Sequence, residues 1–157
     1  MMYQTHVATS LAGGVAIAQL TNTPMDAFLL AGIVIGSLAP DLDHPGSKLG
    51  RRSLGIAHVI HFLFGHRTIT HSILPVVALI LLSIMFPHAL LIGFTLGYIL
   101  HIAGDVCSVQ GVPLLYPFNK KHIKIPLYNT NGLVEKIIIF PLACLSIMYL
   151  IFSGFVV

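Results

Sequence analysis

Five apolar segments run through this chain, and few folds can accommodate them. They cover residues 3–20, 23–40, 71–86, 89–106 and 133–157. Charged residues make up only 8% of the sequence, against about 25% in soluble domains. A chain of 157 residues is too small to bury that much apolar surface in a core of its own. We therefore predict an all-α fold, a polytopic membrane helix bundle of about five apolar helices that forms one integral-membrane domain over residues 1–157.

Local signals refine this bundle. The first two segments are shorter than the ~20 residues that a spanning helix usually needs, so they either cross a thinned bilayer or pack inside the bundle. Thr23, Pro24 and Asp26 predict the start of the second helix, with Thr23 as its cap. Pro141 predicts a kink in the fifth helix. Residues 54–64 are too short to span and predict a short interfacial or re-entrant helix. The first segment lacks a preceding basic region, so we expect it to be retained rather than cleaved.

Basic residues fall on one side of the predicted bundle only. Five segments place the connecting loops alternately on two sides, and all eight lysine and arginine residues lie on the side of the N-terminus. They are Lys48, Arg51, Arg52, Arg67, Lys120, Lys121, Lys124 and Lys136. By the positive-inside rule this side is cytoplasmic. We predict a multi-pass protein of the prokaryotic plasma (inner) membrane, with the N-terminus in the cytoplasm and the C-terminus outside.

Histidines and aspartates gather at that same side, where the apolar segments begin or end. Ionisable side chains there are costly unless they bind something, and imidazole and carboxylate are natural metal ligands. His101 and Asp105 are four residues apart in a helix, so they share a face. The candidate metal ligands are His6, Asp41, Asp43, His44, His66, His71, His101 and Asp105.

Other roles for some of these residues stay open. Asp43 and His44 would also suit helix capping or salt bridges to nearby arginines. His101 and Asp105 taken alone would suit an intrahelical hydrogen bond. Four further histidines receive no metal role: His58 and His61, which we expect at the interface, and His88 and His122, which we expect to be structural or solvated.

Three motifs occur together in a characteristic order: PDLDHP at residues 40–45, HRTITHS at 66–72 and GYILHIAGD at 97–105. With them the chain resembles the YdjM-like family of membrane-bound predicted metal-dependent hydrolases, over roughly residues 6–117. The pattern is more distantly similar to zinc-dependent phospholipase C, an all-α enzyme with metal ions at helix ends. The late His-x-x-x-Glu ligands of that enzyme have no clear counterpart here. The similarity implies as ligands His6, Asp41, His66 or His71, and His101 with Asp105.

These features predict a membrane-embedded metal-dependent hydrolase that cleaves a phosphoester with metal-activated water at the cytoplasmic face. We expect divalent ions, two of them, with zinc first and manganese or iron as alternatives. Asp41 and Asp105 are the predicted catalytic carboxylates, and Arg67, with Arg51 or Arg52, would hold a phosphate. The same arginines equally suit membrane orientation and contact with anionic lipid. The expected partners are the lipid bilayer and a phospholipid or lipid-phosphate substrate; nothing indicates nucleic acid, and the oligomeric state stays open.

Proteins of another class could carry the same residues. Intramembrane histidines and aspartates also mark ion pathways, which would fit a metal transporter. The candidate ligands gather at one end of the bundle, however, which favours a site over a pathway. A non-enzymatic, metal-stabilised membrane adaptor is the other alternative. A lipid-phosphate phosphatase with a histidine nucleophile ranks lower, because the chain lacks a Pro-Ser-Gly-His turn.

Overall fold

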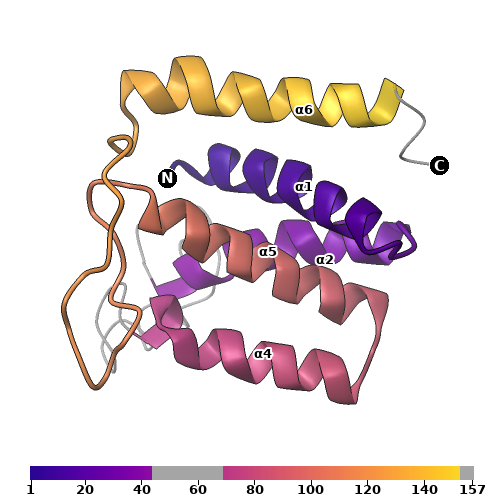
Figure 1. Cartoon of the computed structure of the whole chain (residues 1–157), viewed down its shortest axis with the longest axis horizontal. Coiled ribbons are helices and arrows are strands. Elements are labelled where there is room, and N and C mark those ends of the chain that lie inside the picture. Colours follow the sequence, from indigo (N-terminus) through magenta and orange to yellow (C-terminus); the bar gives the residue numbers. More distant parts are fainter. Residues whose placement is uncertain (44–68, 153–157) are drawn as a thin grey trace.

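The computed structural model describes residues 1–43 and 69–152, and these residues form the predicted all-α fold. The predicted interfacial helix at 54–64 lies outside the described residues, as do residues 153–157 of the fifth predicted segment. The α-helices are α1 (Tyr3–Leu20), α2 (Ala27–Leu38), α4 (Ile73–Met85), α5 (Ala89–Val106) and α6 (Phe140–Phe152) (Figure 1). The described part of the chain also contains the 3₁₀ turns η1 (Pro40–Asp43) and η3 (Ile69–His71), and the π-helix η4 (Glu135–Ile139).

The start of α2 differs from the sequence prediction. The helix begins at Ala27, and Asp26 is its cap, because the Asp26 carboxylate accepts a 2.8 Å hydrogen bond from the backbone N–H of Leu29. The predicted cap at Thr23 is therefore wrong. The hydroxyl of Thr23 instead lies 2.8 Å from the hydroxyl of Thr21, in the turn between α1 and α2.

The fifth predicted segment is helical but changes type along its length. The π-helix η4 leads directly into α6, and Pro141 is the second residue of α6. A proline ring collides with the carbonyl group four residues before it, here that of Ile137. A π-helical turn over residues 135–139 directly precedes this proline, and such turns occur as local irregularities in α-helices. The sequence predicts a kink at Pro141, and the structure has its helical irregularity in the π turn just before this proline.

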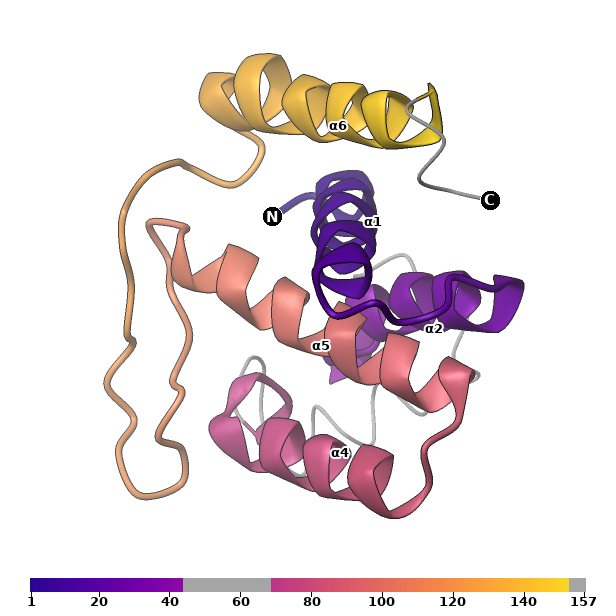
Figure 2. The same ribbon diagram turned by 45° about the vertical axis from the view of Figure 1, so that its right-hand side comes forward.

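Helix α5 lies at the centre of the bundle (Figures 1 and 2). It packs against α2 and α1 on one side and against α4 on the other, while α6 covers the far side of α1. A hydroxyl pair joins α4 to α5, since Ser83 Oγ lies 2.8 Å from Thr95 Oγ1. Residues 107–132 then cross the end of the bundle and lead to η4 (Figure 1).

The contact between α2 and α5 is unusually close because both helices carry a Gly-x-x-x-Gly step. A side chain at Gly36 would overlap the carbonyl of Phe94, and one at Gly97 would overlap the carbonyl of Ile33. Such steps let two backbones touch directly in an apolar environment. Ser37 follows Gly36, and His101 lies one helical turn beyond Gly97. The glycine contact therefore sets how α2 meets the part of α5 that carries His101.

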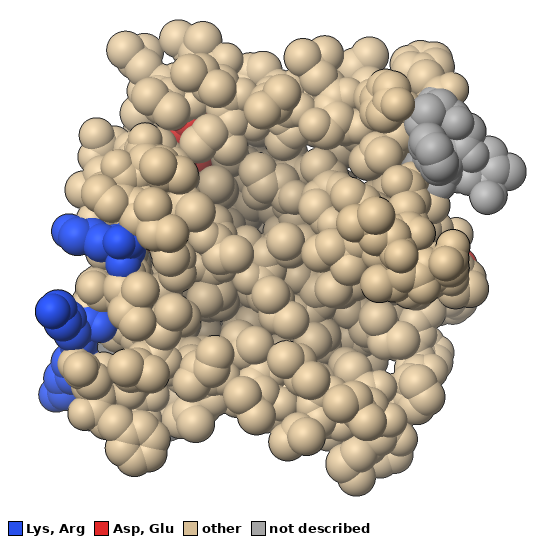
Figure 3. All heavy atoms as spheres, in the orientation of Figure 1, with Lys and Arg blue, Asp and Glu red and all other residues tan. Residues whose placement is uncertain are grey.

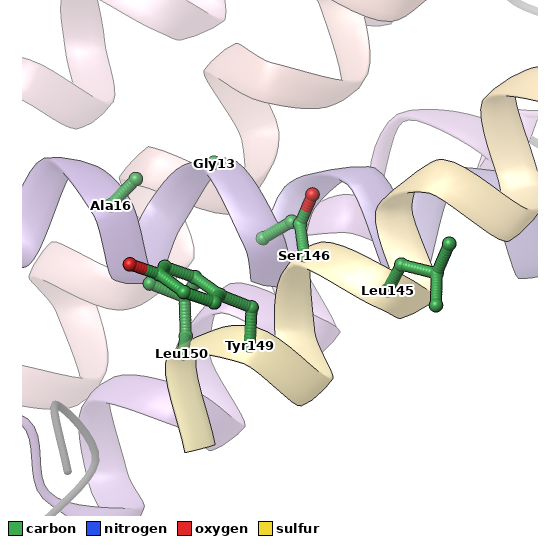
Figure 4. A pocket seen from close by; sticks show the side chains of 7 residues that line it. Gly13, Ala16, Leu145, Ser146, Tyr149 and Leu150 are labelled. Atoms are coloured by element: carbon green, nitrogen blue, oxygen red, sulfur yellow. The ribbon is translucent and has the colours of Figure 1, made fainter. Parts of the chain in front are cut away.

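Within residues 1–43 and 69–152, two helices are long and apolar enough to cross a membrane, namely Ala89–Val106 and the continuous run Glu135–Phe152, whereas α2 and α4 are apolar but shorter. Much of the apolar surface faces outward, as in α4, where Leu81 and Ile84 are exposed. An open pocket of about 520 Å³ separates part of α6 from α1, between Gly13 and Ala16 on one side and Ser146 and Tyr149 on the other (Figure 4). It contains no titratable side chain except the Tyr149 phenol, so the candidate ligands lie elsewhere.

Candidate metal centre

Five of the candidate ligands come together at one end of the bundle. They arrive from four elements and are buried except for Asp41, whose side chain is 20% exposed. Their ligand atoms form two overlapping groups, and within each group the atoms lie within 4.8 Å of one another. We refer to these residues as the His–Asp cluster: His6 of α1, Asp41 of η1, His71 of η3, and His101 and Asp105 of α5.

The orientation of His101 is fixed by α2. Its Nδ1 lies 2.6 Å from the carbonyl oxygen of Ser37, and because a carbonyl can only accept, Nδ1 must carry the proton. The neutral ring then has its lone pair on Nε2, as metal-bound histidines do. Nε2 lies 3.9 Å from Asp41 Oδ1 and 3.8 Å from Asp105 Oδ2. It is buried and has no hydrogen-bond partner among the described residues.

His71 faces the same two carboxylates as His101. Its Nε2 lies 3.6 Å from Asp105 Oδ2 and 3.9 Å from Asp41 Oδ1, and its Nδ1 lies 3.0 Å from Thr70 Oγ1. The turn that holds it is anchored by α5, because the Tyr98 hydroxyl donates to the Thr70 carbonyl. Ser72 caps α4 immediately after this turn, so His71 sits where η3 meets the following helix.

His6 packs flat on His101, with ring centroids 3.6 Å apart and an interplanar angle of 9°. Two imidazolium rings at this separation would repel each other strongly, so the stack favours the neutral form that binds metal. His6 Nε2 lies 3.2 Å from Asp105 Oδ1. Its Nδ1 is buried without a hydrogen-bond partner among the described residues.

Asp105 occupies the middle of the cluster, and its two oxygens face different histidines. Oδ1 faces His6, while Oδ2 faces both His71 and His101. Its side chain is fully buried. With both oxygens facing imidazoles, this carboxylate could help to hold metal ions, which would supply Lewis acidity.

The donor set fits a divalent metal. Three imidazoles and two carboxylates suit zinc, manganese or iron. Tetrahedral bonds of 2.0–2.2 Å place ligand atoms roughly 3.3–3.6 Å apart. Here the Nε2 atoms of His71 and His101 lie 3.6 and 3.8 Å from Asp105 Oδ2, and His71 Nε2 lies 3.9 Å from Asp41 Oδ1. A small inward movement of the side chains would complete such a shell. An ion would also satisfy the buried Nε2 of His101, which otherwise loses its water at a cost of about 1–3 kcal/mol.

Three predicted ligands and one predicted catalytic residue cannot be placed in this geometry. The backbone of Asp43 ends η1, but its side chain lies outside the described part of the structure. His44, His66 and Arg67 lie outside the described residues altogether, as do Arg51, Arg52, His58 and His61.

The two histidines expected to be structural or solvated lie away from the cluster. His88 caps α5 at the opposite end of that helix, where its Nδ1 accepts a hydrogen bond from the N–H of Leu90 at 3.2 Å. His122 is exposed, and its ring Nδ1 lies 3.0 Å from the carbonyl oxygen of Gln110.

Two groups that lie near the cluster were not identified from the sequence, the amino group of Met1 and the side chain of Glu135. The amino group of Met1 lies 2.7 Å from Asp105 Oδ1. Glu135 is fully buried, and its two oxygens accept 2.6 Å hydrogen bonds from the N–H groups of Met2 and Asn131. The signal for Glu135 was its rarity, since it is one of only five acidic residues and stands in an apolar segment. It ties η4 to the residues that lead into α1 and His6.

Comparison with known proteins places this chain among bacterial membrane proteins. A family model described as YdjM inner membrane protein matches residues 1–156. Inner membrane protein YdjM of Escherichia coli (strain K12) is 36% identical over 129 residues, which cover 74% of this chain and 66% of that protein. The protein of the same name from Shigella flexneri has the same identity and coverage. The chain thus matches slightly less than two thirds of the length of these two relatives.

A relative of matching length also exists. Uncharacterized protein YvsG of Bacillus subtilis (strain 168) is 31% identical over 160 residues, covering 98% of each chain. No solved structure matches the chain significantly.

Proposed function

The chain belongs to the YdjM family of inner membrane proteins, and from this premise we propose that its His–Asp cluster is the active centre of a membrane-embedded, metal-dependent phosphoester hydrolase. The observation that carries the proposal is the position of Asp105. Its carboxylate stands between His6 on one oxygen and His71 with His101 on the other. A purely structural ion pair would not require three imidazoles around one buried carboxylate.

The residues divide into holding and positioning roles. His6, His71, His101, Asp41 and Asp105 would hold one or two divalent ions, zinc first, with manganese or iron as alternatives. Such ions supply Lewis acidity, which activates water at neutral pH and offsets phosphoryl charge. The Ser37 carbonyl orients His101 through its Nδ1–H. Asp41 is the one cluster side chain that reaches solvent, which supports a role for its carboxylate oxygens in accepting a proton from incoming water.

Phosphate recognition falls to basic residues on the same side of the chain. Arg67 precedes η3 by two residues in the sequence, and a guanidinium can bind a phosphate in bidentate fashion. Arg51 or Arg52 would assist. The substrates to try first are lipid phosphates and phospholipids, because the cluster lies at the end of the bundle, at the depth of lipid headgroups.

We further propose a multi-pass topology with the cluster facing the cytoplasm. Exposed lysines Lys120, Lys121 and Lys124 follow α5 at the end of the bundle where Asp105 lies. The positive-inside rule assigns that end to the cytoplasm. The N-terminus is then cytoplasmic and the C-terminus lies outside.

Turnover of a lipid phosphate by the purified protein tests this proposal. The full chain is reconstituted in lipid nanodiscs with zinc or manganese, and phosphate release from phosphatidic acid is measured for the unaltered protein and for Asp105→Asn. Asp105→Asn should abolish nearly all turnover. The matched control is Asp26→Asn, the same chemical change at the cap of α2, where asparagine serves as well as aspartate. Undiminished turnover in Asp105→Asn would refute the mechanism, and bound metal without turnover on any phosphoester would favour an adaptor or a transporter.

A further inference from the structure

The segment between α5 and η4, residues 107–132, is an ordered loop held by its own backbone. Val112 and Ile123 exchange two hydrogen bonds, N–H of Val112 to O of Ile123 at 3.1 Å and the reverse at 2.9 Å. Nearer the bundle, the N–H of Val109 donates to the carbonyl of Tyr128 at 3.0 Å. The two arms of this loop are therefore paired over much of their length. Its shape exists before it meets any partner, so little ordering entropy opposes binding.

The 107–132 loop is also fixed to the end of the bundle. The N–H of Ile73, at the start of α4, donates to the carbonyl of Leu114 at 2.8 Å. The Tyr128 hydroxyl donates to the carbonyl of Gly104 in α5 at 2.6 Å. Figures 1 and 2 show the loop running across the helix ends, transverse to α4 and α5. If the helices cross a membrane, a loop so placed lies along the membrane surface.

The lysines are the charged side chains of this loop, and large apolar side chains are exposed beside them. Phe118 is 89% exposed, and Leu115, Ile125 and Leu127 are exposed as well. Among them stand exposed Lys120, Lys121 and Lys124, and residues 107–132 include no aspartate or glutamate. The basic side chains visible in Figure 3 line one edge of the molecule. The three lysines therefore give the loop a net positive charge, and the loop has no acidic side chain to neutralise it.

Neither water nor hydrocarbon alone suits such a surface. Water would leave a row of large apolar side chains exposed on a rigid loop, and hydrocarbon would leave the lysines unsolvated. The boundary between lipid headgroups and acyl chains accommodates both, because aromatic and aliphatic groups enter the upper acyl region while lysines reach the phosphates. The excess positive charge selects a bilayer that carries negative charge.

We propose that the 107–132 loop binds an anionic phospholipid surface, with Phe118 inserted at the headgroup boundary and Lys120, Lys121 and Lys124 on headgroup phosphates. The occupant is the leaflet in which the bundle itself sits. This binding goes beyond the hydrolase proposal and does not depend on it. It would also gather anionic lipid beside the His–Asp cluster, because the root of the loop is bonded to Asp105: the Ser108 hydroxyl donates to the Asp105 carbonyl at 2.8 Å.

The chain contains no tryptophan, so one introduced indole reports on one position. Phe118→Trp is well suited, since the side chain is exposed and replacement disturbs no packing. The full chain is reconstituted in nanodiscs of phosphatidylcholine, with or without phosphatidylglycerol. Emission wavelength, quenching by lipids brominated near the top of the acyl chain, and quenching by aqueous acrylamide are recorded. A second protein adds Lys120→Gln, Lys121→Gln and Lys124→Gln to Phe118→Trp.

Phe28→Trp is the matched control, because Phe28 is an exposed aromatic residue at the end of the bundle where α5 begins, beside His88. In bilayers with phosphatidylglycerol, the indole at position 118 should emit at shorter wavelength and be quenched by brominated lipid. Removal of phosphatidylglycerol or of the three lysines should shift quenching toward acrylamide, and the control should not respond to either change. An indole at 118 that stays open to acrylamide in anionic bilayers overturns the proposal. Equal insertion with and without anionic lipid overturns it too.

Discussion

The Nδ1 of His101 donates a 2.6 Å hydrogen bond to the backbone carbonyl of Ser37. This one contact joins the packing of the bundle to the chemistry of the His–Asp cluster. It requires α2 and α5 to touch backbone to backbone, which the glycines at 36 and 97 permit. It also leaves Nε2 of His101 as the unprotonated nitrogen facing Asp41 and Asp105.

Widening this helix contact should therefore damage the cluster from a distance. Gly97→Ala places a methyl group against the carbonyl of Ile33, which cannot yield without moving α2. We expect a loss of stability of about 1–3 kcal/mol from overpacking and a lower metal content, both measured on purified protein. The control is Gly13→Ala, whose methyl group meets only the flexible end of the Leu100 side chain at 3.2 Å. Equal behaviour of the two variants would show that the α2–α5 contact does not position His101.

Glu135 should act on the cluster without binding metal itself. Its two oxygens accept from two backbone N–H groups, whereas the glutamine of Glu135→Gln has one acceptor oxygen and turns an NH₂ group toward the other donor. We expect about 1–3 kcal/mol of destabilisation and a lower metal affinity, because Glu135 holds the residue that leads into α1 and His6. Lys136→Gln, at the adjacent exposed position, is the control. Unchanged metal affinity in Glu135→Gln would confine its role to folding.

Substitutions of Arg67 and Asp105 should have different effects on metal content and on phosphate binding. Arg67→Ala should leave the metal content intact and weaken phosphate binding by roughly 1.5–3 kcal/mol, the usual worth of a charged hydrogen bond. Asp105→Asn should reduce both metal content and turnover. Metal analysis and substrate titration on the same preparations separate the two. Loss of metal in Arg67→Ala would contradict the role given to this arginine.

The proposed topology gives opposite signals from two fusions at the C-terminus. Alkaline phosphatase attached there should be active, because it folds outside the cytoplasm, and a fluorescent protein should stay dark. The physical basis is the position of all eight basic residues on one side of the predicted bundle. The reverse pattern would place the C-terminus in the cytoplasm and would contradict the assignment of the cluster to the cytoplasmic face.

Much of the fold could be predicted because apolar segments and turn residues determine helices locally. The helices Tyr3–Leu20 and Ala89–Val106 have the expected bounds. The start of α2 could not be predicted, because Thr23 and Asp26 both offer capping oxygens and only the fold decides between them. In the cluster, the i, i+4 spacing predicted that His101 and Asp105 share a face.

Other features of the cluster depend on how helices meet, and no local pattern encodes that. The stacking of His6 on His101 requires α1 to cross α5 at one particular height. The division of the Asp105 oxygens between His6 and the pair His71 and His101 follows from the same crossing. Glu135 was missed because its partners are backbone N–H groups, which leave no trace in a sequence.

The metal content of the purified full-length chain tests the central claim most directly. Elemental analysis of the unaltered protein should find one or two divalent ions per chain, and the double variant Asp41→Ala, His101→Ala should lose them. His88→Asn, which replaces the histidine cap at the opposite end of α5 by another capping residue, should keep them. Unaltered protein without stoichiometric metal, or a double variant that retains it in full, would contradict the account.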